Sequence, residues 1–194
     1  MTFAPLPRTA AWHHHESRTG FEIVVFTAGQ SRLGLRGGTA AVEDGEAWAV
    51  QYDITLDGAW RTTAATVRGL SADGARETAL EVDASGHWRV DGSARPDLDG
   101  CLDVDLEASA CTNTIPVHRL SLGVGDGADA PAAYVRADDL AVERLEQRYV
   151  RADDTGGPHR RYEYSAPAFG VATQVTCDDA GLVLTYPGIA RRAL

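Results

Sequence analysis

The sequence contains no lysine, few cysteines and no long apolar run. All 18 of its basic residues are arginines, against 28 aspartates and glutamates, so the formal net charge is −10. A chain this acidic repels phosphate backbones, so neither nucleic acid nor an anionic membrane surface is an expected partner. Its apolar runs fall far short of the roughly 20 residues that a transmembrane helix needs, so no transmembrane segment is predicted.

The shortage of cysteine bears on the compartment. Cys101, Cys111 and Cys177 form no CxxC pair, which favours reduced thiols over a disulfide framework. The first sixteen residues, MTFAPLPRTAAWHHHE, lack a basic segment followed by an apolar one, so no signal peptide is expected. Together these observations predict a cytoplasmic protein.

Several motifs of chemistry are also missing. There is no GxSxG elbow and no Walker loop, and GVGDG at 123–127 lacks the flanking strand and helix of a dinucleotide-binding loop. The histidines at 13–15 alternate faces on an extended strand, so only His13 and His15 could share a side. We expect a solvated segment there, and we predict neither a metal site nor a cofactor.

The length and composition are those of one folded domain. The chain has 194 residues, 44% hydrophobic and 24% charged, which is ordinary for a globular protein. No linker-like stretch divides it, so a single domain over residues 1–194 is predicted.

The main pattern is alternation of polar and apolar residues. In AWAVQYDITLD, residues 47–57, one face carries Trp48, Val50, Tyr52, Ile54 and Leu56, as in a half-buried strand. Further strands, each closed by turn residues, are predicted at 21–27, 59–70, 75–83, 87–92, 101–107, 115–123, 132–138, 140–152, 160–166, 170–178 and 181–188.

About a dozen strands with tight connections define the expected fold class. Parallel neighbours need long crossovers, so antiparallel order is predicted. The one helix candidate is DDLAVERLEQRY at 138–149, and its alternation favours a strand. The chain is therefore predicted to be mainly β, with little helix.

Four aspartates form a row in PDLDGCLDVDLE, at positions 97, 99, 103 and 105. In an extended strand they would span ~26 Å, too far to share one calcium ion. A solvated or arginine-paired face is the default interpretation, with Arg119 as the nearest candidate partner. Asp103 and Asp105 also meet the ~5–9.5 Å separation of a glycosidase acid/base pair, although any DxD on a strand does so.

Thiol chemistry is a weaker alternative. Cys101 or Cys111 could pair with His118 as a nucleophile and base, but the spacing is not specific for that chemistry. Packed thiols are the simpler interpretation.

Six pieces of the sequence carry a resemblance to a known family: Trp12, GHWRVDG at 86–92, PDLDGCLDVDL at 96–106, TNTIPVHRL at 112–120, Gln147-Arg148-Tyr149 and GLVLTYPG at 181–188. They make the chain similar to a bacterial glycolipid-binding family once grouped only as a domain of unknown function. The resemblance implies a single-domain spiral β-roll, a half-barrel that cups an amphiphilic molecule. It implies no catalytic residue.

The first functional hypothesis is non-catalytic binding of an amphiphilic ligand, for instance a glycolipid, on the concave side of the sheet. The apolar wall is expected from Trp48, Tyr52, Ile54 and Trp60. The polar head group is expected to meet Asp103, Asp105, Asn113 and Arg119.

Two other hypotheses stay open. One is a hydrolase that uses Asp103 and Asp105 on a sugar-containing substrate, and the other is a protein with no small ligand. The sequence favours a binding protein over an enzyme and does not predict an oligomeric state.

Overall fold

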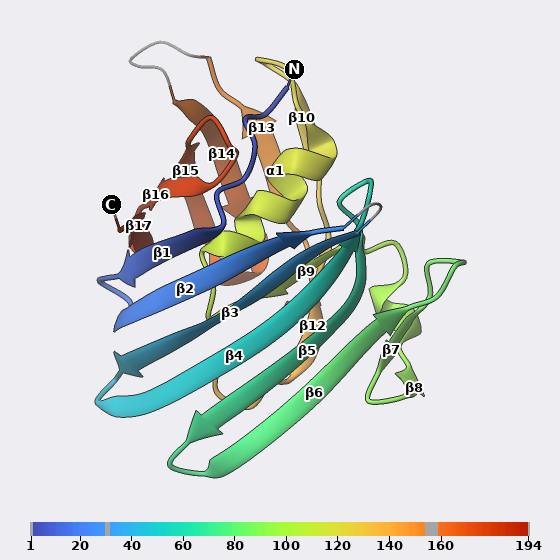
Figure 1. The fold of residues 1–194 in the computed structure, drawn as a ribbon, viewed down its shortest axis with the longest axis vertical. Coiled ribbons are helices and arrows are strands. Elements are labelled where there is room, and N and C mark those ends of the chain that lie inside the picture. The colour runs from blue at the N-terminus through green and yellow to red at the C-terminus, as the bar shows by residue number, and fades with distance from the viewer. Residues whose placement is uncertain (1, 30–31, 154–158, 194) are drawn as a thin grey trace.

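The fold is dominated by one large open sheet. The computed structural model describes residues 2–29, 32–153 and 159–193, which form seventeen strands, one α-helix and three short 3₁₀ turns. Fourteen strands make a single antiparallel sheet in the order β10-β13-β14-β15-β16-β17-β1-β2-β3-β4-β5-β6-β7-β8 (Figure 1). Within the described residues, the end strands β10 and β8 do not pair with each other, so the sheet is not closed. The prediction of a mainly β half-barrel is confirmed in this sense.

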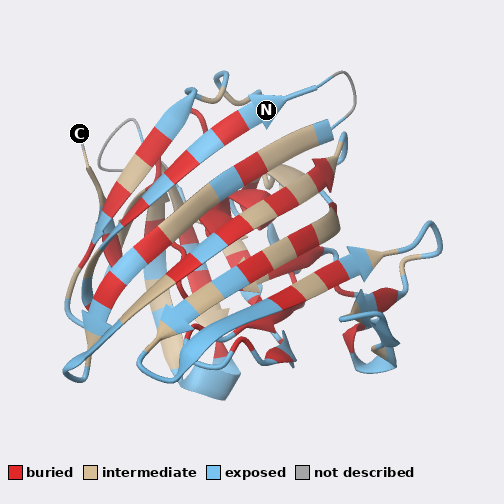
Figure 2. Ribbon diagram, turned by 60° about the horizontal axis from the view of Figure 1, so that its bottom comes forward, coloured by how far each residue is buried: buried red, intermediate tan, exposed pale blue. Residues whose placement is uncertain are grey.

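The first eight strands follow one another as antiparallel neighbours. They are β1 (Thr9–His14), β2 (Thr19–Ala28), β3 (Arg32–Glu43), β4 (Glu46–Asp57), β5 (Thr62–Ser71), β6 (Gly74–Val82), β7 (Trp88–Val90) and β8 (Ser93–Ala94). Buried and exposed residues alternate along these strands (Figure 2). The alternation predicted for 47–57 is therefore confirmed, with Val50, Tyr52 and Ile54 buried on the inner face.

The C-terminal half supplies the remaining strands of the large sheet. They are β10 (Gly127–Asp129), β13 (Arg148–Arg151), β14 (Arg160–Ala166), β15 (Val171–Cys177), β16 (Val183–Tyr186) and β17 (Ala190–Arg192). The last of these pairs antiparallel with β1, with Trp12 opposite Arg192, and this pairing joins the two halves.

A small second sheet lies against the concave side. It contains β9 (Asp103–Leu106), β11 (Ala132–Val135) and β12 (Val142–Leu145). Strands β9 and β11 are parallel, so antiparallel order throughout the chain was a wrong expectation. The long connection between them supplies the crossover that a parallel pair needs. The strand preference of 140–152 is confirmed, although β12 and β13 belong to different sheets.

The prediction of a strand at 115–123 is wrong, because α1 (Thr114–Leu120) occupies this segment. The β-branched residues Ile115 and Val117 favour a strand locally, but both are buried on the helix. Pro116 lies in the first helical turn, where its missing N–H leaves no bond unmade. No helix in the described part of the chain is long and apolar enough to cross a membrane.

The core fills the space between the large sheet, the small sheet and α1. Trp12 and Trp88 are completely buried, and each indole finds a carbonyl: Trp12 donates to Val183 at 2.7 Å and Trp88 to Cys101 at 3.0 Å. The Trp12 bond joins β1 to β16 within the large sheet, and the Trp88 bond joins β7 to the segment that leads into β9 of the small sheet.

Candidate functional site

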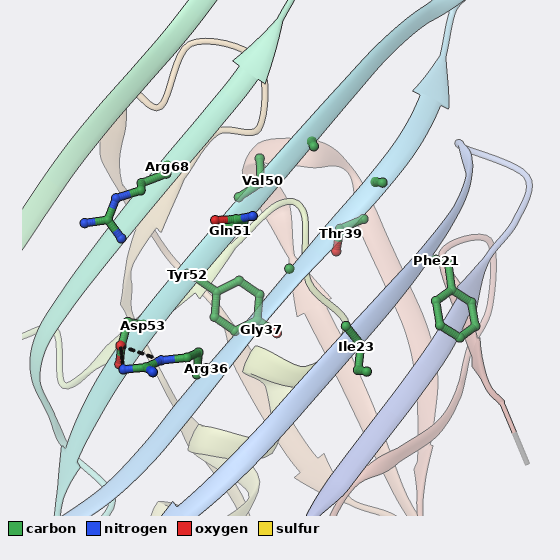
Figure 3. A pocket seen from close by; sticks show the side chains of 13 residues that line it. Phe21, Ile23, Arg36, Gly37, Thr39, Val50, Gln51, Tyr52, Asp53 and Arg68 are labelled. Atoms are coloured by element: carbon green, nitrogen blue, oxygen red, sulfur yellow. Dashed lines mark hydrogen bonds and ion pairs between the residues drawn. The ribbon is translucent and has the colours of Figure 1, made fainter.

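A groove of about 590 Å³ lies on the outer face of the large sheet (Figure 3). It lies over Gly37 and Gly38 of β3. Its charges are already satisfied, because Arg36 donates to Asp53 at 2.6 and 2.9 Å and Arg68 pairs with Glu77. The groove therefore offers few unpaired polar groups to a ligand.

A smaller cavity of about 230 Å³ lies on the concave side, and we call it the inner cavity. It lies between the small sheet and strands β14 to β16. Its lining combines charged, amide, hydroxyl and aromatic groups: Arg18, Asp105, Leu106, Glu107, Ser109, Asn113, Tyr134, Leu145, Tyr164, Ala166, Phe169, Val171, Tyr186 and Ile189. A small concave site with convergent polar groups is the usual form of a ligand pocket.

Asp105 lies on the floor of this cavity, in the middle of β9. Its Oδ1 accepts the Thr112 hydroxyl at 2.8 Å and its Oδ2 accepts the Gln147 amide at 2.5 Å. Burial raises the pKa of Asp105 more than these neutral donors lower it. The carboxyl group is thus held in position by neutral donors, and no cation of the described residues pairs with it.

Asp103 has a different environment on the same strand. Arg119 of α1 donates to both of its oxygens, from Nε at 2.7 Å and from Nη2 at 2.5 Å. Asp103 is buried and lines neither the groove nor the inner cavity, so the arginine pairing predicted for the acidic row is confirmed here. Asp97 lies within a 3₁₀ turn at Pro96–Leu98 and Asp99 directly follows it, so the expectation that all four aspartates lie along one strand is wrong.

Asn113 and Ser109 hold the side of the cavity next to α1. Tyr149 donates its hydroxyl to the Asn113 Oδ1 at 2.7 Å, which leaves the amide NH₂ aimed at the backbone of Ala110, 3.4 Å away. Ser109 donates to Glu22, a completely buried carboxylate that also accepts the Tyr52 hydroxyl at 2.6 Å. Hydrogen bonds within the protein therefore fix the orientation of the polar side chains on this wall.

Aromatic rings form the opposite wall. The Tyr164 and Tyr186 rings meet edge to face with centroids 5.7 Å apart, and the Tyr134 and Phe169 rings lie 5.1 Å apart. Burial raises the pKa of Tyr134, Tyr164 and Tyr186, so their hydroxyls stay protonated. Phe169 is 47% exposed and marks the point where the cavity meets solvent.

Arg18 and Glu107 complete the rim. The Arg18 side chain is almost fully buried, lies 5.3 Å over the Trp48 ring and donates to the Glu107 carbonyl at 3.0 Å. The Glu43 and Glu107 carboxylates stand 3.5 and 3.9 Å from its guanidinium. Two acids thus surround this one cation.

The structure separates the predicted ligand-binding residues. Asp105 and Asn113 line the inner cavity. Asp103, two residues before Asp105 on β9, is paired with Arg119 of α1 and does not line the cavity. Tyr52 and Ile54 are buried in the core, so they do not form the open apolar wall that was expected. Trp60 stacks on His118 at 3.7 Å, next to α1, and does not line the cavity.

Sequence reasoning missed the tyrosines that form the aromatic wall. Tyr186 lies in GLVLTYPG, which was noted only for the family resemblance. Nothing in the sequence indicated that Tyr134 and Tyr186 line one cavity, because they belong to different sheets.

The histidine segment is only partly solvated. His14 is buried on β1 and its Nε2 lies 3.7 Å from Glu22, so the expectation of a solvated segment is wrong at this position. The described residues contain no group of three or more His, Cys, Asp or Glu side chains that could hold a metal ion.

The thiols are packed residues. All three cysteines are free and buried, and burial raises the pKa of Cys101 to about 11. Burial also lowers the pKa of His118 to about 4, and its Nε2 lies 2.8 Å from the Ala180 carbonyl. Neither group is prepared for nucleophilic chemistry near neutral pH.

Comparison with known proteins gives one family and two related structures. The model of the family described as "Putative glycolipid-binding" matches residues 9–192. A crystal structure of a DUF1089 family protein from Pseudomonas aeruginosa is 31% identical, covers 100% of this chain and 98% of that one, and superposes with a TM-score of 0.72.

A second structure, a β-barrel-like protein of the DUF1849 domain from Brucella abortus, is 8% identical with a TM-score of 0.53, covers 95% of this chain and 92% of that one, and shows a shared fold alone. No curated protein matches the sequence.

Proposed function

Because the chain belongs to the "Putative glycolipid-binding" family, we propose that it binds an amphiphilic ligand, such as a glycolipid, without transforming it. The polar head group enters the inner cavity on the concave side of the sheet. The apolar part lies outward across Phe169 and Val171.

The observation that carries this proposal is the change of character along the cavity. Its floor holds the Asp105 carboxyl and the Asn113 amide, its wall holds neutral tyrosine hydroxyls, and its mouth holds the exposed Phe169 ring. A volume of about 230 Å³ is below the ~300–1,000 Å³ of drug-sized pockets, so it suits one head group and not a whole lipid.

Filling the cavity tests the proposal. The protein is titrated with octyl glucoside below its micelle concentration, by calorimetry, as wild type, Ala166→Leu and Ala40→Leu. Ala166 lines the inner cavity and Ala40 lines the outer groove, so the two variants are a matched pair. We expect at least tenfold weaker binding for Ala166→Leu and no change for Ala40→Leu.

A loss of binding in Ala40→Leu alone would move the site to the outer groove. Because Ala166 is buried and its enlargement can strain the fold, Tyr186→Phe serves as a second variant. It removes one cavity hydroxyl at almost constant volume, and we expect severalfold weaker binding.

The hydrolase alternative now depends on other residues. Asp103 is occupied by Arg119, whereas Asp105, with its raised pKa, shares the cavity with Glu107. An acid with a raised pKa beside a second carboxylate is the arrangement of a glycosidase. A screen of nitrophenyl glycosides distinguishes the two functions. Hydrolysis by the wild type that is lost in Asp105→Asn would favour the hydrolase over the binding protein.

We place this function in the cytoplasm. The support is the chemistry of the thiols, since Cys101, Cys111 and Cys177 are all free and buried. Fractionation of the native host would test the location.

A further inference from the structure

We infer that the head group bound in the inner cavity carries a positive charge, an ammonium group that sits against Asp105 and the tyrosine rings. This inference rests on the proposed function and names the class of ligand for the same cavity. An amino sugar or a quaternary ammonium alcohol would supply the required chemistry.

Asp105 has no counter-charge among the described residues. Its donors are all neutral, namely the Thr112 and Gln147 side chains and the Leu106 backbone, and no ion pair to Asp105 occurs among the described residues. A carboxylate deep in a protein is normally paired with a cation or coordinated to a metal. Part of the Asp105 surface remains open to the cavity, so a ligand can reach it.

The charges next to the cavity are mainly negative. Arg18 is the cation that lines the cavity, and Glu107 and Glu43 both stand within 4 Å of its guanidinium. The charged side chains that line the cavity are one arginine, Arg18, and two carboxylates, Asp105 and Glu107. Arg136 also interacts with Glu107 from outside the cavity, but it pairs with Asp138. An anionic head group would therefore meet net repulsion, and a cationic one net attraction.

The aromatic wall also suits a cation. Tyr134, Tyr164, Tyr186 and Phe169 surround the space next to Asp105. The faces of aromatic rings attract cations, and a carboxylate within a ring of aromatic side chains is a recurrent way to bind alkylated ammonium groups. The buried tyrosines keep their protons, so the wall adds no competing charge.

A matched pair of amphiphiles tests the charge preference. The probes are octyl glucoside and its 2-amino-2-deoxy analogue, which differ in one hydroxyl replaced by an ammonium. Decyltrimethylammonium is a third probe, which distinguishes an amino sugar from a quaternary ammonium as the source of the charge. All three are titrated below their micelle concentrations by calorimetry at pH 7.

The variants separate the cavity from general attraction to an acidic protein. Asp105→Asn removes the charge in the cavity, and Asp97→Asn removes one exposed charge elsewhere on the same acidic stretch. We expect one of the cationic probes to bind wild type and Asp97→Asn about tenfold more tightly than octyl glucoside. In Asp105→Asn that preference should fall to about one.

Two results would overturn the inference and leave the proposed function standing: equal affinities for charged and neutral probes, or a preference that survives in Asp105→Asn. Failure of all three probes to bind would overturn both. Because Asp105→Asn keeps the shape of the side chain, a folded variant is expected, and its circular dichroism spectrum checks that point.

Discussion

Asp103 and Asp105 are two residues apart on the same strand, yet the protein closes one of them with Arg119 and leaves the other open to a cavity. The first carboxylate has a built-in cation and joins β9 to α1. The second has only neutral donors, which fix its position but leave its charge unbalanced. A buried acid with its own partner supports the fold, and one without a partner is available to a ligand.

The largest effect in this comparison is expected at Arg119. Arg119→Met should lower the free energy of unfolding by about 3–5 kcal/mol, because it leaves the buried Asp103 carboxylate without its counter-ion. Urea unfolding measures the change. Arg119→Lys is the control that keeps the charge but loses the two-pronged hydrogen bonding, and it should recover only part of the loss. A change below about 1 kcal/mol for Arg119→Met would show that the pair is not structural.

Removing the other partner should cost less. Asp103→Asn keeps the shape and one acceptor, and the Arg119 side chain is 12% exposed, so it can turn toward water. We expect a loss of about 2 kcal/mol, the usual cost of a hydrogen bond to a charged group. The double variant with Arg119→Met gives the coupling energy, and a coupling near zero would contradict the pairing in solution.

At Asp105 the expected sign is reversed. Asp105→Asn should stabilise the free protein by roughly 1 kcal/mol at pH 7, because it removes a buried charge without a cation. The folded pKa of Asp105 is raised, so its contribution to stability is full below the unfolded pKa and is lost as the pH rises through the folded one.

The stabilisation should therefore disappear in acid, where the native carboxyl is already protonated. Thermal unfolding of wild type and Asp105→Asn between pH 4 and pH 8 measures this dependence. A stabilisation independent of pH would exclude ionisation of Asp105 as its cause.

The smallest effect is expected at Asp97, which belongs to the same acidic stretch but pairs with Arg95 at the surface. Asp97→Ala should change the free energy of unfolding by less than about 0.5 kcal/mol, because exposed ion pairs contribute little. Urea unfolding in low and high salt checks this. A loss above 1 kcal/mol would mean that exposure does not explain the differences along the row.

Alternation in the sequence was enough to predict strands such as β4, because one face of that strand is buried and the other is not. It did not predict β3, whose segment RLGLRGGTAAVE contains three glycines. The reason for Gly37 is tertiary: a Cβ there would lie 2.6 Å from the Tyr52 ring and from the Ile23 carbonyl. Such a requirement is visible only once β2, β3 and β4 are side by side.

The pairing of Asp103 with Arg119 could be proposed from their closeness in the sequence. The sequence could not show which of the two aspartates faces a cavity, because that depends on the position of α1. With 115–123 taken as a strand, the position of Arg119 relative to β9 was undefined. The helix directs Arg119 to Asp103, and Pro116 was the local signal that pointed to it.

The pairing of β17 with β1 has a consequence for synthesis on the ribosome. Strands β1 to β6 are consecutive neighbours, so they can assemble as soon as they emerge. The middle of the large sheet cannot assemble so early, because the second edge of β1 is covered only after residues 190–192 have been synthesised. During that interval β1 is an edge strand open to other chains, so slow translation of the last third should favour aggregation.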